Sequence, residues 1–332
     1  MKNFADKIAF ITGGASGAGF GQAQIFSEAG MKVVIADVRR DHLDEAMEYF
    51  NNKGAPVHAI RLDVTDREAS AAAADEVERV FGAAPDLLVL TAGVNVFGPV
   101  EASTYDDFDW VMGVCFGGVL NGLITFVPRM IKAGKGGHVT ATVSWGAFGA
   151  DAMAAPYTAA KAAVLNLMES YHKALKPYGI GVSALCPANI KTRIHETALR
   201  TRPEHLKNTG YNVTEKTQEF LASVMAHGME PRDLAERHKK GIENGQFLII
   251  PYQNGPRMVE IELQRFSDYA SPEGMRRIEE REQQPLTDEL VKLMSLREGY
   301  EITQETRSIF TSDTGFAKAR ADLDWVDIDK KA

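Results

Sequence analysis

Short apolar runs alternate with longer amphipathic stretches along roughly the first 250 residues of the chain. The runs hold few polar residues, as strands do when helices cover both faces of a sheet. The segments between them supply the crossovers that parallel strands require. The predicted strands lie at residues 7–11, 32–36, 57–62, 86–90, 137–143, 181–186 and 247–250. The pattern therefore predicts an α/β fold, a doubly wound (Rossmann) sheet of about seven parallel strands with helices on both faces.

The pattern changes after Pro251, where charged residues become frequent and no strand is evident. We expect a Rossmann-type domain over residues 1–252 and a helical C-terminal extension over residues 253–332. Apolar positions at helical spacing, such as Leu290, Leu293 and Met294, favour an extension that packs on its own core or on a partner subunit over a loose tail. The expected helices span residues 260–270, 272–283, 286–297 and, with a weaker pattern, 316–325.

A glycine cluster, TGGASGAG from Thr12 to Gly19, joins the first strand to the first helix. Glycines allow a tight turn and a close backbone approach to a pyrophosphate, and the helix N-terminus offers free N–H groups. An ordinary glycine-rich turn would look similar. The position of this cluster in the first βαβ unit, however, is the one that dinucleotide binding requires.

Two acidic residues end the second and third strands and each allows two interpretations. Asp37 can accept hydrogen bonds from the ribose hydroxyls of NAD, or it can cap the next helix. We favour the ribose, which predicts NAD, although Arg39 and Arg40 leave NADP as the less favoured cofactor. Asp63 can accept from the adenine amino group or cap the following helix.

Tyr157 and Lys161 lie four residues apart in a strong helical pattern, PYTAAKAAVLNLM. This spacing places both side chains on one helix face, where the ammonium would lower the pKa of the phenol towards the range useful for proton transfer. The pair alone also arises by chance on solvated helices. Ser144 ends the fifth strand, at the sheet edge where this architecture binds ligands, and could hold a substrate oxygen beside Tyr157.

The motifs TGGASGAG, LDV and YTAAK, with Asp37 and Ser144 between them, resemble the short-chain dehydrogenase/reductase family over about residues 5–250. The resemblance implies NAD(P)-dependent interconversion of alcohols and carbonyls, in a homodimer or homotetramer. It implies Tyr157 as the acid/base, Ser144 as the substrate-orienting hydroxyl and Lys161 as the residue that holds the nicotinamide ribose and tunes Tyr157. The implied cofactor-binding residues are Gly13, Ser16, Gly17, Gly19, Asp37, Asp63, Val64, Ala92, Gly93, Tyr157, Lys161, Pro187, Ile190 and Thr192.

A narrower resemblance rests on ITGGASGAGFGQA, TAGVNVFGP, TYDDFDW, TFVPRMI and PANIK. These stretches are similar to the bacterial Cα-dehydrogenases of lignin-derived β-aryl ethers, which oxidise a benzylic secondary alcohol with NAD. The stretch 194–228 could form a mobile lid over the site. Bulky apolar residues expected near the substrate are Val94, Phe97, Trp145, Phe148, Met153, Ile190 and Ile194, although part of this set could only pack the core. A hydrophobic, aromatic alcohol or ketone is the expected substrate.

One position departs from the family pattern, because Cys115 stands where an Asn usually steadies a water beside the catalytic Lys. A thiol is a weak hydrogen-bonding group and cannot replace an amide. Cys115 can be a small buried residue, a sign of an altered proton relay or, least favoured, a redox group. This departure and the long extension keep open an alternative, a dinucleotide-binding protein with little turnover.

Composition excludes several classes of partner and location. The 45 acidic and 37 basic residues give a net charge of -8, which argues against a nucleic-acid partner. The chain has two cysteines, Cys115 and Cys186, which favours the reducing cytoplasm over a secreted disulfide scaffold. We found no metal-binding spacing of His or Cys, no signal-peptide pattern and no uninterrupted apolar stretch long enough to span a membrane, so none of these is expected.

Overall fold

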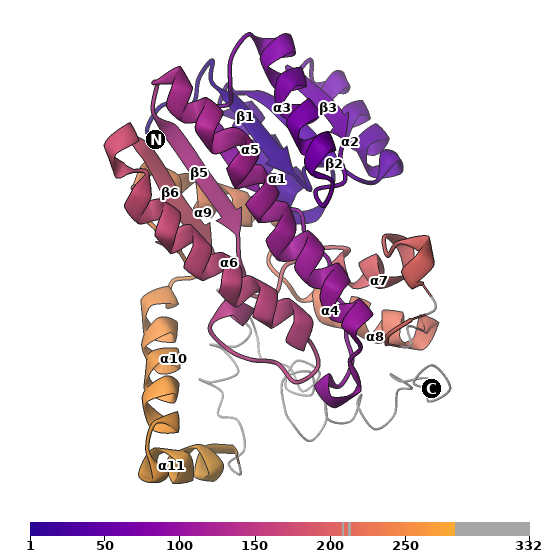
Figure 1. Ribbon diagram of the computed structural model, residues 1–332, viewed down its shortest axis with the longest axis vertical. Helices are drawn as coiled ribbons and strands as arrows, with labels where there is room; N and C mark the ends of the chain where they lie inside the picture. The colour runs from indigo at the N-terminus through magenta and orange to yellow at the C-terminus, as the bar shows by residue number, and fades with distance from the viewer. Residues whose placement is uncertain (208, 212–213, 283–332) are drawn as a thin grey trace.

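A computed structural model describes residues 1–207, 209–211 and 214–282 of the chain. Its strands form one seven-stranded parallel sheet in the order β3-β2-β1-β4-β5-β6-β7, which confirms the predicted doubly wound fold (Figure 1). The strands are β1 (Ile8–Thr12), β2 (Lys32–Asp37), β3 (Val57–Arg61), β4 (Leu87–Leu90), β5 (Gly137–Thr142), β6 (Ile180–Leu185) and β7 (Leu248–Ile249).

Helices cover both faces of the sheet, because neighbouring side chains along each strand point to opposite faces. In β1, Phe10 packs on Phe126 with ring centroids 4.4 Å apart, while Ala9 and Ile11 enter the core of the other face. One face is covered by α1 (Gly17–Glu28), α2 (Arg40–Asn52) and α9 (Pro231–Glu243). The opposite face is covered by α3 (Arg67–Phe81), α5 (Gly118–Ala133) and α6 (Ala155–Ala174).

The remaining short elements follow the carboxyl ends of the strands or link the helices. They are η1 (Val100–Ala102), α4 (Tyr105–Met112), the π-helical turn η2 (Gly113–Gly117), η3 (Trp145–Ala147), η4 (Lys176–Tyr178), η5 (Ile194–Glu196), α7 (Thr197–Arg200), η6 (Glu204–Leu206) and α8 (Glu215–Ala226). α4, η2 and α5 run on as one helix, Tyr105–Ala133. By length and composition this helix, alone among the described residues, could cross a membrane, but half of its most apolar window is buried in the fold.

The C-terminal extension begins with α10 (Gly255–Tyr269) and α11 (Pro272–Glu282), which project from the body of the protein in Figure 1. Arg265 of α10 donates to the carbonyl oxygen of Phe148, which fastens the helix to the loop after β5. These two helices match the predicted segments 260–270 and 272–283. The predicted helices at 286–297 and 316–325, with Leu290, Leu293 and Met294, lie outside the described residues.

His238 of α9 is fully buried against the sheet, and burial lowers its pKa to about 3. Its ring nitrogens lie 3.1 Å from Gln22 Nε2 and 2.9 Å from Thr140 Oγ1. In the unfolded chain a histidine has a pKa of about 6.5. Between this pH and the lowered pKa of buried His238, the unfolded state therefore binds one proton more than the folded state. We expect the free energy of unfolding to fall as the pH drops below about 6.5, by about 1.4 kcal/mol per pH unit from His238.

Denaturant unfolding at neutral and mildly acidic pH checks this expectation. The His238→Gln variant should lose less stability on acidification than the parent protein. His205→Gln, which replaces an exposed histidine, should keep the parent's pH dependence. An identical pH dependence in the parent and His238→Gln would show that His238 does not supply the acid sensitivity.

Candidate active site

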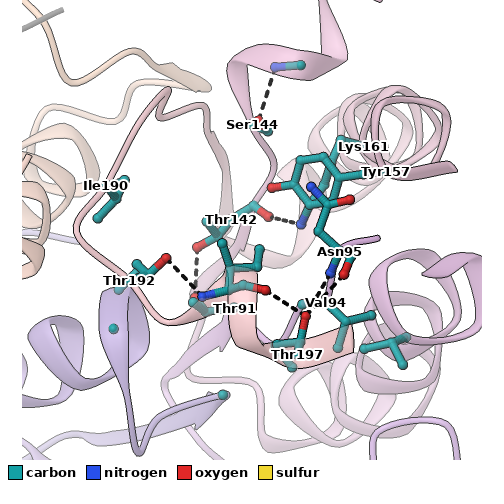
Figure 2. Close-up of a pocket in the computed structure, with 18 of the residues that line it drawn as sticks. Thr91, Val94, Asn95, Thr142, Ser144, Tyr157, Lys161, Ile190, Thr192 and Thr197 are labelled. Carbon is teal, nitrogen blue, oxygen red and sulfur yellow. Dashed lines mark hydrogen bonds between the residues drawn. The ribbon is translucent and has the colours of Figure 1, made fainter. Parts of the chain in front are cut away.

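A cavity of about 790 Å³ opens at the carboxyl ends of the strands, where β1 and β4 lie side by side and their following segments diverge. Its wall includes the glycine turn after β1, the ends of β2, β4 and β5, and the segment after β6 (Figure 2). The structure brings every predicted catalytic and cofactor-binding residue to this one cavity. They are Gly13, Ser16, Gly17, Gly19, Asp37, Asp63, Val64, Ala92, Gly93, Ser144, Tyr157, Lys161, Pro187, Ile190 and Thr192.

The glycine turn is packed so closely that side chains would fill it. Gly13 and Gly17 have φ of 65° and 49°, in the region that favours glycine. A Cβ on Gly19 would lie 2.0 Å from the carbonyl oxygen of Gly13. α1 begins at Gly17, and its N-cap Ser16 makes no side-chain capping bond, so the hydroxyl and the first N–H groups of the helix remain for a ligand. This turn therefore fits a pyrophosphate at the helix N-terminus.

Asp37 ends β2 at the opposite side of the turn. Its carboxylate accepts from the backbone N–H of Arg39 at 3.0 Å and of Ala15 at 3.4 Å, which ties the strand end to the glycine turn. The N-cap of α2 is Arg39, so Asp37 does not occupy the capping position that the alternative interpretation required. Burial raises the pKa of Asp37. Further donors from a ligand would stabilise this partly buried carboxylate, since it can accept more hydrogen bonds than it receives.

Asp63 follows β3 and also lines the cavity. Its Oδ1 accepts from the backbone N–H and the hydroxyl of Thr65, at 2.9 Å and 2.7 Å. The cap of α3 is Asp66, which accepts from the N–H of Ala69. The interpretation of Asp63 as a helix cap is therefore wrong. Its position in the cavity wall is compatible with the other interpretation, a contact with the adenine amino group.

The first two turns of α6 carry Tyr157 and Lys161 into the cavity (Figure 2). Lys161 is buried, and its Nζ lies 5.4 Å from the centre of the Tyr157 ring and donates to the carbonyl oxygen of Thr142 at 2.8 Å. Ser144, just after β5, accepts from the N–H of Gly146 at 3.0 Å and hydrogen-bonds the Tyr157 phenol. Two hydroxyls thus meet beside a fixed ammonium.

The pKa of Tyr157 is raised, which is the reverse of the predicted direction. Burial in the cavity wall penalises the phenolate, and this effect exceeds the lowering of the pKa by the Lys161 charge and the Ser144 hydrogen bond. The sequence reveals the neighbouring ammonium but not the degree of burial. In the protein alone, the phenol therefore keeps its proton.

Five of the residues predicted near the substrate line the cavity, namely Val94, Phe97, Trp145, Ile190 and Ile194. Phe148 and Met153 are not among its lining residues, so their predicted place is wrong. Phe148 follows the turn η3 and packs against Trp145, with ring centroids 5.2 Å apart and ring planes tilted by 42°. Met153 is buried, and its carbonyl oxygen accepts from the N–H of Gly98 at 2.9 Å.

A sequence profile described as short chain dehydrogenase matches residues 7–203, more than half of the chain. The chain belongs to the short-chain dehydrogenase family. The C alpha-dehydrogenase of Sphingobium sp. strain SYK-6 is 53% identical over 272 residues, which cover 82% of this chain and 89% of that protein. The expected resemblance to bacterial Cα-dehydrogenases is thereby confirmed.

Solved structures of short-chain dehydrogenases agree with the fold. The apo form of LigD from the same Sphingobium strain is 47% identical and has a TM-score of 0.68, covering 81% of this chain and 100% of the LigD chain. A family member from Burkholderia phymatum in complex with NAD is 31% identical, with a TM-score of 0.75, covering 81% of this chain and 96% of that one. The family binds a nicotinamide dinucleotide, and the cradle and the carboxylate described above fit one.

Cys115, at the position where this short-chain dehydrogenase departs from the usual Asn, is fully buried in η2. Its Sγ donates to the carbonyl oxygen of Val94 at 3.2 Å and accepts from the N–H of Val94 at 3.4 Å. Burial raises the pKa of the thiol, which keeps it protonated and unreactive. The prediction of a small buried residue is confirmed. Asn121 donates to Val64, so it does not take the place of the missing amide.

Removal of the two hydrogen bonds between Cys115 and Val94 should lower the stability of the protein. In Cys115→Ala the N–H and C=O of Val94 lose their partner, and we expect about 1–2 kcal/mol less unfolding free energy. Cys115→Ser can make both bonds and serves as the matched control. Denaturant unfolding of the three proteins checks the prediction, and an Ala variant as stable as the parent would contradict it.

Several cavity residues were not predicted from the sequence, among them Asn95, Trp110, Thr197 and, from α10, Glu262. The segment 194–203, part of the predicted lid, also borders the cavity. It is fixed to α4 by a buried ion pair in which Arg202 lies 2.9 Å from Asp107. The capping box of Thr104 and Asp107 in TYDD could have marked the start of α4, but no sequence signal pairs Asp107 with a residue so far along the chain.

Proposed function

We propose that this short-chain dehydrogenase uses NAD to interconvert a hydrophobic, aromatic secondary alcohol and its ketone, with Tyr157 as the acid/base. The observation that carries the proposal is the meeting of Ser144, Tyr157 and Lys161 with the glycine cradle in one cavity. The hydroxyl pair can hold one substrate oxygen at the end of the cavity that apolar side chains line. The residues proposed for proton transfer and those proposed for cofactor binding thus line the same cavity.

NAD, when bound, supplies the hydride acceptor and a positive charge. The chain's own residues supply the proton chemistry. Ser144 and Tyr157 hydrogen-bond the substrate oxygen. During oxidation the phenolate form of Tyr157 takes the alcohol proton, and during reduction the phenol gives its proton to the ketone oxygen. Burial raises the pKa of Tyr157, so the fixed charge of Lys161 is needed to stabilise the phenolate. The Thr142 carbonyl holds Lys161 in place for this task.

The substrate class rests on the cavity wall and on the Sphingobium relative. Val94, Phe97, Trp145 and Ile194 present apolar and aromatic surface, which favours a ring-bearing substrate. The name of the relative, C alpha-dehydrogenase, supports oxidation at the carbon next to the aromatic ring. Asp37 supports NAD over NADP, because its carboxylate would repel a 2′-phosphate.

Assembly belongs to the proposal as well. We propose a cytoplasmic homodimer or homotetramer, in which exposed apolar side chains of the long helix, such as Ile124 at 60% exposure, would be covered. Light scattering on the purified full chain measures the assembly directly.

A panel of aryl secondary alcohols with NAD, and the matching ketones with NADH, tests the function at the nicotinamide absorbance. Turnover of aryl alcohols above that of short aliphatic ones is expected. Tight binding of NADH without turnover of any member of the panel would instead favour the alternative of a dinucleotide-binding protein that acts through interactions.

A further inference from the structure

Three side chains, Thr91, Thr142 and Gln22, form a closed ring of hydrogen bonds at the carboxyl ends of β4 and β5. The Thr91 hydroxyl donates to Gln22 Oε1 at 2.7 Å and lies 2.8 Å from the Thr142 hydroxyl. Thr91 has a single hydroxyl hydrogen, so Thr142 must be the donor in the second bond. Gln22 Nε2 closes the hydroxyl–amide ring by donating to Thr142 Oγ1 at 3.4 Å. Figure 2 shows Thr91 and Thr142 beside Lys161.

His238 of α9 fixes the direction in which the Gln22 amide points. An amide nitrogen only donates, so His238 Nδ1, which lies 3.1 Å from Gln22 Nε2, must accept. Burial keeps the imidazole neutral, and its Nε2 then donates to Thr140 Oγ1 at 2.9 Å. Gln22, Thr140 and His238 are fully buried. The hydroxyl–amide ring is therefore anchored in the core, with Gln22 Oε1 held towards Thr91.

The backbone carbonyl of Thr142 holds the ammonium of Lys161. The N–H of Val143 donates to Leu185 of β6 at 2.7 Å, so the Thr142 carbonyl, on the opposite side of the same trans peptide, points towards β4. β4 ends at Leu90, and its ladder with β5 stops before this carbonyl. Lys161 Nζ donates to the carbonyl at 2.8 Å instead.

Beyond the end of this ladder, side chains take over the pairing of β4 with β5. The N–H groups of Thr91 and Ala92 lie 3.1 Å and 3.3 Å from Thr12 Oγ1 of β1, to which they donate. The bond between the hydroxyls of Thr91 and Thr142 therefore joins β4 to β5 at this point. It sets the gap between the two strand ends, and with it the place of the carbonyl that holds Lys161.

We propose that the hydroxyl–amide ring of Thr91, Thr142 and Gln22 positions the Lys161 ammonium beside Tyr157. The inference rests on the proposed function, because the ammonium matters there as the charge that stabilises the Tyr157 phenolate. The three are positioning residues, since their side chains act through the Thr142 carbonyl. Their arrangement connects the cofactor helix α1 and the core helix α9 to the proton-transfer pair.

The charge of Lys161 determines how readily the Tyr157 phenol ionises. Cys115 interacts electrostatically with Tyr157, and Cys186 with Lys161. Burial raises the pKa of both thiols, so neither adds a charge near neutral pH. A displaced ammonium would stabilise the phenolate less, and alcohol oxidation would then require a higher pH.

Thr142→Val tests the proposal, because it removes the hydroxyl and keeps the size of the side chain and the backbone carbonyl. We expect kcat for alcohol oxidation to fall about tenfold or more at neutral pH, as misplaced catalytic groups do. The deficit should shrink as the pH rises, since the phenol then ionises with less help. Thr142→Ser restores the hydroxyl and should restore the parent's rate and pH profile. Thr91→Val and Thr91→Ser repeat the comparison if Thr142→Val does not fold.

Ser183→Ala is the matched control, because it removes a buried hydroxyl of β6 that lies 2.8 Å from His138, outside the hydroxyl–amide ring. Its stability should fall, while its kcat should keep the parent's pH profile.

Crystal structures of the parent and the Val variant give a readout that needs no turnover. The contact between Lys161 Nζ and the carbonyl oxygen of residue 142 should lengthen or break in Thr142→Val. An unmoved Lys161, or the parent's pH profile in Thr142→Val, would overturn the inference alone. A displaced Lys161 in a protein whose parent oxidises no alcohol would overturn the proposed function and leave the positioning of Lys161 standing.

Discussion

Replacement of Tyr157 by Phe is expected to lower kcat for alcohol oxidation about a thousandfold while the protein still folds and binds NADH. The substitution removes one oxygen that lies beside Ser144 and within the reach of Lys161. Without it, no group at that point can take the alcohol proton. The ring remains to fill its place in the wall, so the cavity and the cofactor cradle should keep their shape.

Steady-state rates together with NADH fluorescence titration separate catalysis from binding for this variant. Tyr171→Phe is the matched control, because it removes a phenol oxygen from the same helix at a residue that packs on the core away from the cavity. The control should retain the parent's rate. A Tyr157→Phe variant within about tenfold of the parent would remove Tyr157 from the role of acid/base.

Replacement of Asp37 by Ala is expected to raise the NADP-to-NAD ratio of kcat/KM about a hundredfold. The carboxylate lies in the cavity wall at the end of β2, where it would accept from the ribose of NAD and repel a 2′-phosphate. Arg39 also lines this part of the cavity, with its guanidinium paired to Asp41. Loss of the Asp37 charge would leave that cation to face a phosphate.

Kinetics with both cofactors measure this ratio. Asp44→Ala removes an exposed carboxylate from α2, the helix that follows β2, and should leave the ratio unchanged, which controls for net charge. A ratio in Asp37→Ala equal to that of the parent would show that Asp37 does not select the cofactor.

Much of the fold could be predicted because its determinants are local. The apolar runs predicted the strands, and their alternation with helices predicted a parallel sheet. In such a sheet the carboxyl ends of all strands lie at one edge. From that edge followed the meeting of Gly13, Asp37, Ser144 and Tyr157, residues far apart in the sequence. Gly13, Asp37 and Ser144 lie at the carboxyl ends of β1, β2 and β5, and Tyr157 lies at the start of α6.

The parts that were missed depend on packing between distant segments. Asn95 pairs with Thr197, a residue 102 positions away, and nothing in either segment signals the partner. The pKa of Tyr157 depends on how deeply the wall buries it, which the Tyr-x-x-x-Lys spacing does not encode. Phe148 was assigned to the substrate from its chemistry, but Trp145 lines the cavity while Phe148 packs against the Trp145 ring, and the sequence does not encode this difference.

Transfer of deuterium from the carbinol carbon of an aryl secondary alcohol to the cofactor tests the proposed hydride transfer most directly. The labelled alcohol is incubated with the protein and NAD, and the products are examined by mass spectrometry. We expect one deuterium in the NADH and none in the ketone, and we expect labelled NADH to be almost absent with Tyr157→Phe. Unlabelled NADH, or no NADH from any aryl alcohol, would contradict hydride transfer at this site.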